Sequence, residues 1–506
     1  MRPFSLEAKD CLPFTIKGRQ ADEASDADLR VMDKAMRQFC NYWYAADGYS
    51  DDDDYLARLQ TQPASDASDM PSTQWCAGRY IGIAHLRMPL TEKSQQVDIS
   101  IRPRFGESFL LAILEDIYNI RVAIQDAADS QSAEWFSSLL NILRRRMWVD
   151  KCAKANRYGL PRTNVRQEHQ GAALRGTLDV RRTIRPWLFQ KEVCSTTYEK
   201  VLDDVICKIV YEAHRILSKN IVTIDRKRSR GKQNDQRKDG FGFSMPPTVQ
   251  HTINAQNAQF KGTQFDLTEN DYSRIRYKSI YLSWKPLVDF SWSVIRGRQI
   301  SYQASESQTE CVFVDMAEIW ETFLRKKLAE GFRDEGWRVL TVEECHYLIY
   351  KDKFYEREII PDIILQRGSD YMVFDAKYKR MRGRKSKGKL SDVDRSDLFQ
   401  IHTYIQFVQH HLGNVVLGGL LYPISKDDVS GRDDVDELTF HSDRLFGCEG
   451  NYQTPFIVDG IYCPEPSGVT QMTTEEVEEQ KQNMNDNVEA MINRIKKVIS
   501  YRSTPK

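Results

Sequence analysis

A nearly continuous apolar run, VVLGGLLYPI at residues 415–424, constrains the fold of this chain more than any other feature. The run carries no charge, which suits a strand that is buried on both faces inside a sheet covered by helices. Helical periodicity precedes it at residues 313–332 and 397–411, and strand-like segments lie between them at residues 337–350 and 361–379. This helix–strands–helix–strand order predicts a compact α/β domain.

Weaker patterns organise the chain before this domain. Alternating apolar residues at 80–88 and 97–105 predict strands, and residues 109–124 predict a buried helix. Residues 129–157 and 196–217 have helical periodicity. A small β-rich region is therefore expected before a largely helical one.

Three further segments complete the outline. Residues 174–184 predict a strand, and the basic, weakly patterned residues 220–262 predict a loop. Residues 454–463 predict a late strand, and Thr473 and Glu476 have the spacing of a capping box that would begin a terminal helix.

The expected fold class is therefore α/β, with several domains of mixed type. The expected stretches are residues 1–130 (mixed α+β), 131–300 (largely helical, with the basic loop), 301–430 (the α/β domain) and 431–506 (an extension that ends in a helix).

Composition excludes several classes of protein. No apolar stretch approaches the roughly 20 residues that cross a bilayer, and the first residues do not resemble a secretory signal. Ten cysteines are present without CxxC spacing, so free thiols in a reducing cytoplasm are expected. The 72 basic and 72 acidic side chains balance, which argues mildly against non-specific nucleic-acid binding by the whole chain.

Charge is nevertheless unevenly distributed. Residues 377–389 contain no acid, residues 226–238 are also basic, and residues 51–54 are all aspartate. Each run is either a solvated loop or a contact surface for a charged partner.

The segment PDIILQRGSDYMVFDAKYK at residues 361–379 predicts a β-hairpin with polar residues in unusual places. A turn at residues 366–370 would set Asp362 opposite Asp375, and alternation would put Asp375 and Lys377 on one face. Facing carboxylates repel, so either these are charged residues at a sheet rim or they share a divalent cation. Lys377 could then polarise a water molecule or stabilise charge on a phosphate.

The flanking helices carry further candidates. Glu321 could add a third carboxylate, with Glu318, one turn earlier, as the competing choice. Gln400 and Tyr404 are four residues apart and share one helix face, from which both could donate hydrogen bonds. The alternatives are a surface glutamate and a partly buried tyrosine beside a polar neighbour.

Taken in order, Glu321, Pro361-Asp362, Asp375-Ala376-Lys377 and Gln400-x-x-x-Tyr404 resemble the PD-(D/E)xK nuclease pattern, and the last element resembles its RecB-like branch. The stretches VDMAEIWETFL, PDIIL, VFDAKYKR and SDLFQIHTYIQF are similar to McrC, the nuclease subunit of McrBC-type modification-dependent restriction systems. LRGTLDV and ISIRPRFG are weaker landmarks of that family, which more often has Pro-Lys at the Pro103-Arg104 position.

The resemblance implies a Mg²⁺-dependent DNA endonuclease, with Mn²⁺ as an alternative metal. Asp362, Asp375 and the Ala376 carbonyl would bind the metal, and Glu321 would complete or orient its shell. Lys377 would serve the attacking water, with Gln400 and Tyr404 supporting the site. The basic residues expected to contact DNA are Lys379, Arg380, Arg382, Arg384 and Lys385.

The same resemblance implies two macromolecular partners and no membrane. One is a McrB-like AAA+ GTPase that forms a hexameric ring, into which the N-terminal half would dock, with residues 1–130 as the expected docking region. The other is modified double-stranded DNA. This chain should bind no NTP itself, because GRKSKGKL has Leu390 where a P-loop needs Ser or Thr.

Two other functions stay open at this point. One is a nuclease-like assembly factor that activates an AAA+ ring without cutting DNA. The other is a stand-alone repair nuclease of the same superfamily.

Overall fold

The computed structural model divides the chain into two units, residues 1–143 with 300–506 (unit 1) and residues 144–299 (unit 2). The first, third and fourth expected stretches share unit 1, and the second is almost coextensive with unit 2. The structure describes residues 4–14, 57–62, 72–90, 93–118, 133–219, 245–304, 312–341, 344, 349–352, 355–359, 361–379, 385–386, 389–390, 395–425, 440–441, 456–463 and 474–503.

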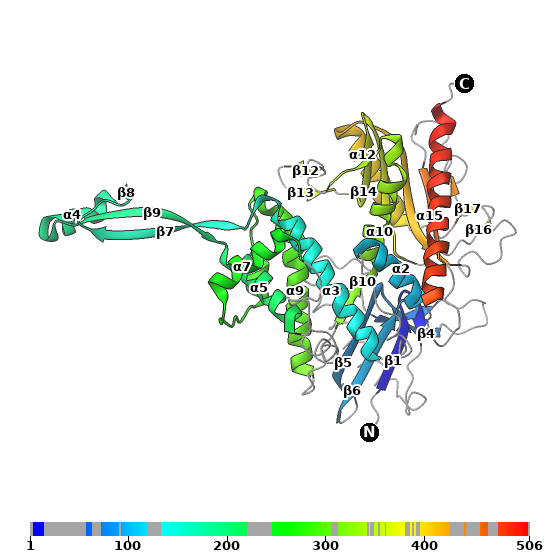
Figure 1. Cartoon of the computed structure of the whole chain (residues 1–506), viewed down its shortest axis with the longest axis horizontal. Coiled ribbons are helices and arrows are strands. Elements are labelled where there is room, and N and C mark those ends of the chain that lie inside the picture. Colours follow the sequence, from blue (N-terminus) through cyan, green and yellow to red (C-terminus); the bar gives the residue numbers. More distant parts are fainter. Residues whose placement is uncertain are drawn as a thin grey trace, which may run out of the picture. The chain divides into compact units, whose positions relative to one another are not determined.

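A six-stranded mixed sheet organises the C-terminal part of unit 1 (Figure 1). Its strands, in spatial order, are β11 (Arg338–Val339), β14 (Ile363–Arg367), β15 (Asp370–Ala376), β18 (Asn414–Ile424), β20 (Phe456–Tyr462) and β19 (Phe440–His441). Strand β18 runs parallel to both of its neighbours and is buried along nearly its whole length. The prediction of a strand buried on both faces is confirmed, because β18 is paired with a strand on each side and its side chains are buried.

Helix α12 (Arg395–His411) covers one face of this sheet. Its buried side chains Ile401, Ile405 and Val408 pack into a cluster with Val373 of β15 and other apolar side chains of β18 and β20. Helix α10 (Met316–Gly331) contacts β14 and β15, and Trp320 of α10 donates a hydrogen bond to the Leu421 carbonyl over 3.3 Å. The sheet and these two helices have the α/β arrangement expected from the sequence.

A second sheet in unit 1 is formed by the N-terminal part of the chain. Its strands, in spatial order, are β1 (Phe4–Lys9), β6 (Lys93–Arg102), β5 (Tyr80–Leu90) and β10 (Val312–Asp315). Strand β10 leads directly into α10, whose first turn is capped by the Asp315 carboxylate accepting from the Ala317 amide over 2.8 Å. The N-terminal sheet is thus covalently continuous with a helix that packs on the six-stranded sheet.

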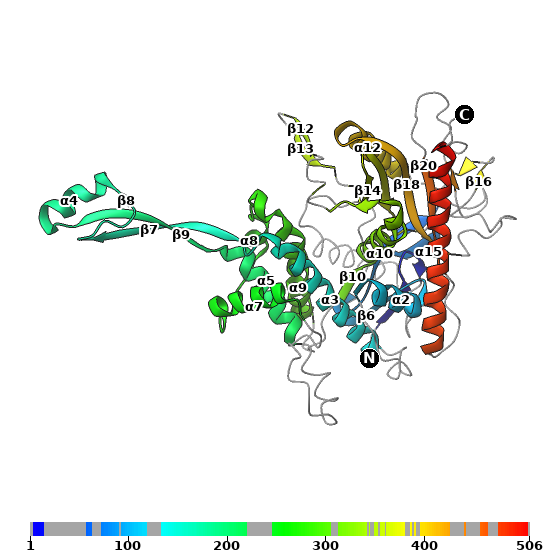
Figure 2. The same ribbon diagram turned by 45° about the horizontal axis from the view of Figure 1, so that its top comes forward.

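Helices α2 (Gly106–Tyr118) and α15 (Thr474–Ser503) pack on each other and on these elements (Figure 2). Lys327 of α10 contacts Asp116 of α2 at 2.9 Å and Asn485 of α15 at 3.3 Å. The buried Asp459 of β20 accepts two hydrogen bonds of 3.0 Å from Arg494. These polar contacts fix the register of the terminal helix against the sheet.

Small sheets account for the remaining described strands of unit 1. They are β2 (Pro13–Phe14) with β4 (Ser72–Ala77) and β3 (Ala57–Gln62), β12 (Ile349–Asp352) with β13 (Tyr355–Glu358), and β16 (Lys385–Ser386) with β17 (Lys389–Leu390).

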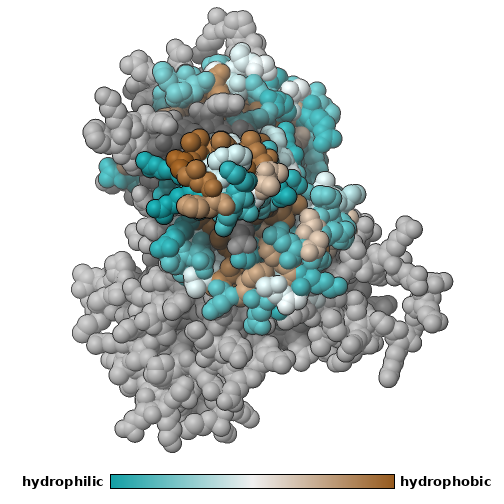
Figure 3. All heavy atoms as spheres, turned by 90° about the vertical axis from the view of Figure 1, so that its left-hand side faces the viewer, coloured by the Kyte–Doolittle hydropathy of each residue, from teal (hydrophilic) through white to brown (hydrophobic). Residues whose placement is uncertain are grey.

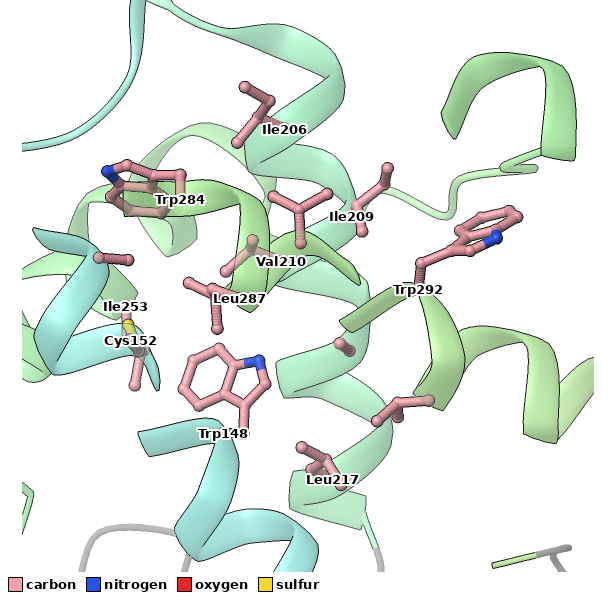
Figure 4. Close-up of a cluster of buried hydrophobic side chains, with 14 of the residues drawn as sticks. Trp148, Cys152, Ile206, Ile209, Val210, Leu217, Ile253, Trp284, Leu287 and Trp292 are labelled. Atoms are coloured by element: carbon pink, nitrogen blue, oxygen red, sulfur yellow. The ribbon is translucent and has the colours of Figure 1, made fainter. Parts of the chain in front are cut away.

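Unit 2 is a helical body with its own hydrophobic core (Figure 4). Its helices are the end of α3 (Ala133–Ala155), α5 (Asp204–Lys219), α7 (Pro247–Phe260), α8 (Glu269–Ser273) and most of α9 (Lys285–Ala304). Trp148 and Trp284 are fully buried at its centre, and the Trp148 indole donates to the Ser291 hydroxyl over 3.1 Å. Because the indole N–H has this hydrogen bond, the large ring is buried without the free-energy cost of an unpaired polar group.

A long antiparallel hairpin leads away from these helices (Figure 1). It consists of β7 (Arg162–Gly171) and β9 (Val193–Leu202), with the short β8 (Thr177–Leu178) and helix α4 (Val180–Gln190) at its far end. Its side chains are mostly exposed along β7 and over all of α4. The hairpin is therefore held mainly by strand pairing rather than by a core of its own.

Three predictions in this region are wrong in part. Residues 174–184 form only the two-residue β8 before α4, because the Asp179 carboxylate caps a helix by accepting from the Arg182 amide over 3.1 Å. Helix α5 begins at Asp204, since the β-branched residues before it pair with β7 as β9. Within the expected loop, residues 247–260 are the helix α7. Residues 220–244 and the expected cap Thr473 lie outside the described residues.

Within the described part of the chain, no helix combines the length and apolar character that crossing a bilayer would require.

The close approach of β18 and β20 generates a stability prediction. A Cβ at Gly419 would lie 2.8 Å from the Ile457 carbonyl oxygen and 2.6 Å from Ile457 Cγ1, and the backbone atom cannot yield. We expect Gly419→Ala to lower the free energy of unfolding by about 1–3 kcal/mol, measured by urea denaturation. Gly171→Ala, which meets nothing within 4 Å, is the matched control and should change stability by less than about 0.5 kcal/mol. Equal stabilities of the two variants would contradict the packing described.

Candidate active site

Two carboxylates face each other where β14 begins and β15 ends. The antiparallel register pairs Ile363 with Phe374, and its continuation by one residue sets Asp362 opposite Asp375. Asp375 is only 1% exposed, and the Ala376 amide donates to Asp362 Oδ2 over 2.8 Å. The predicted hairpin is confirmed, with a tighter turn than expected because Arg367 still pairs with Asp370 and Gly368 adopts φ 61°.

The electrostatics of this pair are unfavourable in the absence of a cation. Burial raises the pKa of Asp362 well above its usual range, and the negative charges of Asp375 and Glu321 raise it further. The hydrogen bond from the Ala376 amide acts in the opposite direction but is outweighed. A site that tolerates two such groups requires positive charge nearby.

Lys377 supplies part of that positive charge. Its Nζ lies 2.7 Å from Asp375 Oδ2 and 3.5 Å from Asp397 Oδ1, and it donates to Gln400 Oε1 over 2.8 Å. Burial by itself lowers the pKa of Lys377, but the charges of Asp375 and Asp397 outweigh it and raise that pKa above its ordinary value. The ammonium group is therefore held protonated beside the carboxylates.

The hydrogen-bond chain continues along α12. Gln400 Nε2 donates to the Tyr404 hydroxyl over 2.8 Å, so Lys377, Gln400 and Tyr404 are linked in series. Burial raises the pKa of Tyr404 to about 12, although the hydrogen bond from Gln400 lowers it. Gln400 and Tyr404, four residues apart, thus lie together on the helix face that points at Lys377.

The structure brings Glu321 rather than Glu318 towards this pair. Arg325 donates to Glu321 Oε1 over 3.2 Å and to the Asp362 carbonyl oxygen, and the Glu321 charge is felt at Asp362. Arg325 also donates to the Leu340 carbonyl over 3.2 Å, which ties α10 to the residue that follows β11. Sequence reasoning missed this arginine, whose one signal was its i,i+4 spacing from Glu321.

Asp397 is a second residue that sequence reasoning missed. It is 4% exposed, lies in the first turn of α12, and contacts Lys379 Nζ through Oδ2 at 2.7 Å in addition to Lys377. The Tyr422 hydroxyl donates to the same Oδ2 over 3.4 Å. A signal was present, because Asp397 precedes Gln400 by three residues and so lies on the same helix face.

Only two of the five residues that are expected to contact DNA lie in the described part of the chain. Lys379 forms an ion pair with Asp397, and its side chain is 29% exposed. Lys385 lies in β16, and nothing further is described of its side chain. Arg380, Arg382 and Arg384 lie outside the described residues.

The oxygen donors at this position suit a hard divalent cation. Asp362 and Asp375 offer carboxylates, which Mg²⁺ prefers, and their mutual repulsion is relieved when a cation lies between them. The Ala376 carbonyl, between Asp375 and Lys377 in the chain, is the neutral donor available beside them. Among the described side chains no three His, Cys, Asp or Glu groups converge as metal ligands, so the protein offers two carboxylates rather than a complete cage.

Comparison with known proteins adds a family relationship. The family model for the McrBC 5-methylcytosine restriction system component matches residues 77–423. Among solved structures, the chain is similar to a refined half-complex from a tetradecameric assembly of Thermococcus gammatolerans McrB AAA+ hexamers with bound McrC, at 14% identity and a TM-score of 0.36, over 95% of this chain and 99% of that chain.

A second similar structure is the cryo-EM structure of the Thermococcus gammatolerans McrBC complex, at 14% identity and a TM-score of 0.31. That match covers 65% of this chain and 88% of that chain. Comparison with curated protein sequences yields no match.

The carboxylate pair predicts how stability responds to pH. Because the folded-state pKa of Asp362 is raised above 3.8, its contribution to stability is present at low pH and is lost as pH rises through the folded pKa. Asp362→Asn cannot ionise, so without metal it should unfold at a higher temperature than the wild type at pH 8, by roughly 2–4 °C for about 1 kcal/mol of relieved repulsion. The difference should vanish near pH 4.

Calorimetry in EDTA and in Mg²⁺ checks this expectation. Mg²⁺ should raise the wild-type midpoint at pH 8 and leave that of Asp362→Asn nearly unchanged. Asp370→Asn, at the other end of β15 beside Asn414, is the control and should respond to Mg²⁺ like the wild type. A wild-type midpoint that rises from pH 4 to pH 8 relative to Asp362→Asn would contradict the assigned electrostatics.

Proposed function

Because the chain belongs to the McrBC 5-methylcytosine restriction system component family, we propose that it is the DNA-cutting subunit of a McrBC-type restriction complex. The reaction is hydrolysis of phosphodiester bonds in DNA, with a PD-(D/E)xK type of active site. The observation that carries this proposal is Lys377 Nζ at 2.7 Å from Asp375 Oδ2, beside the facing Asp362 carboxylate.

Asp362, Asp375 and the Ala376 carbonyl are the groups that would hold Mg²⁺ or Mn²⁺. When bound, such an ion lowers the pKa of a coordinated water and offsets negative charge on the phosphate. Glu321 lies at the edge of this group, where Arg325 orients it. Its role is to adjust the charge around Asp362 rather than to act as an obligatory ligand.

Lys377 serves as a fixed positive charge in this proposal. A lysine whose pKa is raised stays protonated at neutral pH and is poorly suited to remove a proton. It is well suited to stabilise negative charge that develops on a phosphate oxygen, because its position is set by Asp375, Asp397 and Gln400 in advance. Gln400 and Tyr404 orient the lysine and extend the polar surface towards the phosphodiester.

Removing the acidic and basic members of the site should separate cutting from assembly. We expect Asp375→Ala and Lys377→Ala each to lower the rate of DNA cleavage by at least on the order of 10²–10³-fold, the typical loss for a pre-positioned charge. Complex formation with the AAA+ partner and NTP hydrolysis should stay close to wild type. The assay uses the co-purified complex, 5-methylcytosine-containing plasmid, Mg²⁺ and GTP or ATP.

Glu318→Ala is the control for this series, since Glu318 is the neighbouring glutamate that lies one turn from Glu321. It should cut at the wild-type rate. Cleavage that survives both site substitutions would remove the assignment of the site. Wild-type protein that activates the partner without any cleavage would favour the assembly factor, and equal cutting without a partner would favour the stand-alone nuclease.

The proposed partner is a McrB-like AAA+ ring, and unit 2 offers a surface for it. Figure 3, which looks onto the end of the hairpin, shows apolar side chains gathered there. Large apolar side chains around the end of the hairpin are at least 40% exposed, namely Leu174, Leu178, Val180, Ile184, Trp187, Leu188 and Phe189. Such a concentration of exposed apolar side chains on a protein surface is typical of a protein–protein interface.

Phe189, at 84% exposed, gives the sharpest test of this docking surface. We expect the double variant Trp187→Ala/Phe189→Ala to weaken binding to the AAA+ partner by at least about tenfold, because exposed aromatic anchors dominate interface energies. Binding is measured by interferometry with the partner ring in the presence of a non-hydrolysable nucleotide. The thermal midpoint should not fall, since neither side chain is buried.

Ile280→Ala is the matched control, because Ile280 is 54% exposed in unit 2 but lies outside the hairpin. It should bind like the wild type. Unchanged binding by the double variant would move the docking surface elsewhere, with residues 1–130 as the next region to test.

A further inference from the structure

The three residues that follow Ala376 are held from two opposite sides. Lys377 directs its ammonium group to Asp375 and Gln400, and Lys379 contacts Asp397 at 2.7 Å. Between them, Tyr378 is 4% exposed and points away from this group into a separate buried cluster. Since β15 ends at Ala376, the path of this segment depends on these contacts more than on strand pairing.

The buried cluster is formed by the N-terminal sheet. Asp10 follows β1 and Arg104 follows β6, and these two strands are parallel neighbours. The Arg104 amide donates to Asp10 Oδ1 over 2.5 Å, and the Asp10 amide donates to the Arg102 carbonyl over 3.0 Å. The two side chains are therefore fixed at one edge of that sheet.

Tyr378 inserts into this edge. Arg104 Cζ lies 4.7 Å from the Tyr378 ring centroid and 4.7 Å from that of Phe105, so the guanidinium group is stacked between two rings. The Tyr378 hydroxyl and Asp10 Oδ2 are both buried without a hydrogen-bond partner among the described residues, and the two side chains interact electrostatically. Burial, with the Asp10 charge, raises the pKa of Tyr378, so the hydroxyl stays protonated.

The same N-terminal residues also hold the backbone of the segment. Cys11 Sγ donates to the Tyr378 carbonyl over 3.6 Å, and Arg104 donates to the Lys379 carbonyl over 3.4 Å. On the other side, the Lys377 amide donates to the Leu421 carbonyl of β18 over 2.9 Å. The segment is thus bound to both sheets of unit 1.

A buried ionic cluster of this kind is a poor source of stability. Removing Asp10 and Arg104 from water costs about as much as their attraction returns, and an apolar cluster would pack equally well. What a charged cluster adds is a defined geometry, since the stacked guanidinium group and its hydrogen bond to the Lys379 carbonyl fit only one arrangement. That geometry is transmitted to Lys377, the residue directly before Tyr378.

We infer that Asp10, Arg104 and Tyr378 are positioning residues that fix Lys377 for cleavage, so that the N-terminal sheet is a working part of the active site. The inference rests on the proposed nuclease function. A displacement of Lys377 by about 1 Å would be enough to cost on the order of 10²-fold in rate. None of the three side chains needs to touch DNA to have this effect.

Tyr378→Phe tests the inference, because it removes the hydroxyl and keeps the ring on Arg104. We expect the cleavage rate of the complex to fall by roughly 10–100-fold. Amide exchange at Lys377, followed by mass spectrometry of the free chain, should accelerate by roughly tenfold, because the interaction of the buried hydroxyl with the Asp10 carboxylate is lost. Exchange in the rest of β15 and in β18 should not change.

Tyr371→Phe is the matched control, near the start of β15, the strand that Tyr378 follows. Tyr371 is 6% exposed and its hydroxyl accepts from Gln366 over 2.8 Å, so the substitution also removes one buried hydroxyl. It should alter neither cleavage nor exchange at Lys377. Should Tyr378→Phe fail to fold, Asp10→Asn is the second variant, because it keeps an acceptor for the Arg104 amide. It should show the same fall in cleavage rate and the same acceleration of exchange at Lys377.

Wild-type cleavage and wild-type exchange in Tyr378→Phe would overturn the inference. So would acceleration of exchange throughout β15 and β18, because that pattern marks a general loss of stability. The exchange experiment needs no nuclease activity, so it separates the two proposals. If the wild-type complex never cuts DNA, the proposed function fails, while local acceleration at Lys377 would still support the coupling.

Discussion

The repulsion between Asp362 and Asp375 is the interaction on which the rest of unit 1 depends. Two carboxylates on adjacent strands would separate if the surrounding structure allowed it. They are held by the register of β14 and β15, by the Ala376 amide, and by Lys377. The buried β18 and the helix α12 make this arrangement rigid, because neither strand can shift without breaking the apolar cluster beneath it.

The neighbouring side chains offset that repulsion, either directly or by holding another charged group in place. Lys377 is closest, Asp397 keeps both Lys377 and Lys379 in place, and Arg325 restrains Glu321 at the rim. A site arranged in this way is poised to take up positive charge, whether from a metal ion or from a proton on Asp362. The local chemistry and the packing therefore support the same functional interpretation.

The two units contrast in how they use apolar residues. In unit 1 the apolar side chains described are largely inside and hold polar groups in position. In unit 2 the tryptophans Trp148 and Trp284 form a core, whereas Trp187 and Phe189 are displayed on a hairpin that has little core of its own. This division suits a chain in which one part performs chemistry and another contacts a partner.

The sequence by itself determined the order of helices and strands along residues 313–424, the facing carboxylates and the Gln400–Tyr404 face, because periods of two and of about four residues are local properties. It also indicated the family. Only the tertiary structure decided the roles of Arg325, Asp397 and the cluster of Asp10 with Arg104 and Tyr378. Those contacts join residues up to 368 positions apart (378 − 10), and no local pattern specifies which distant charges will share a buried space.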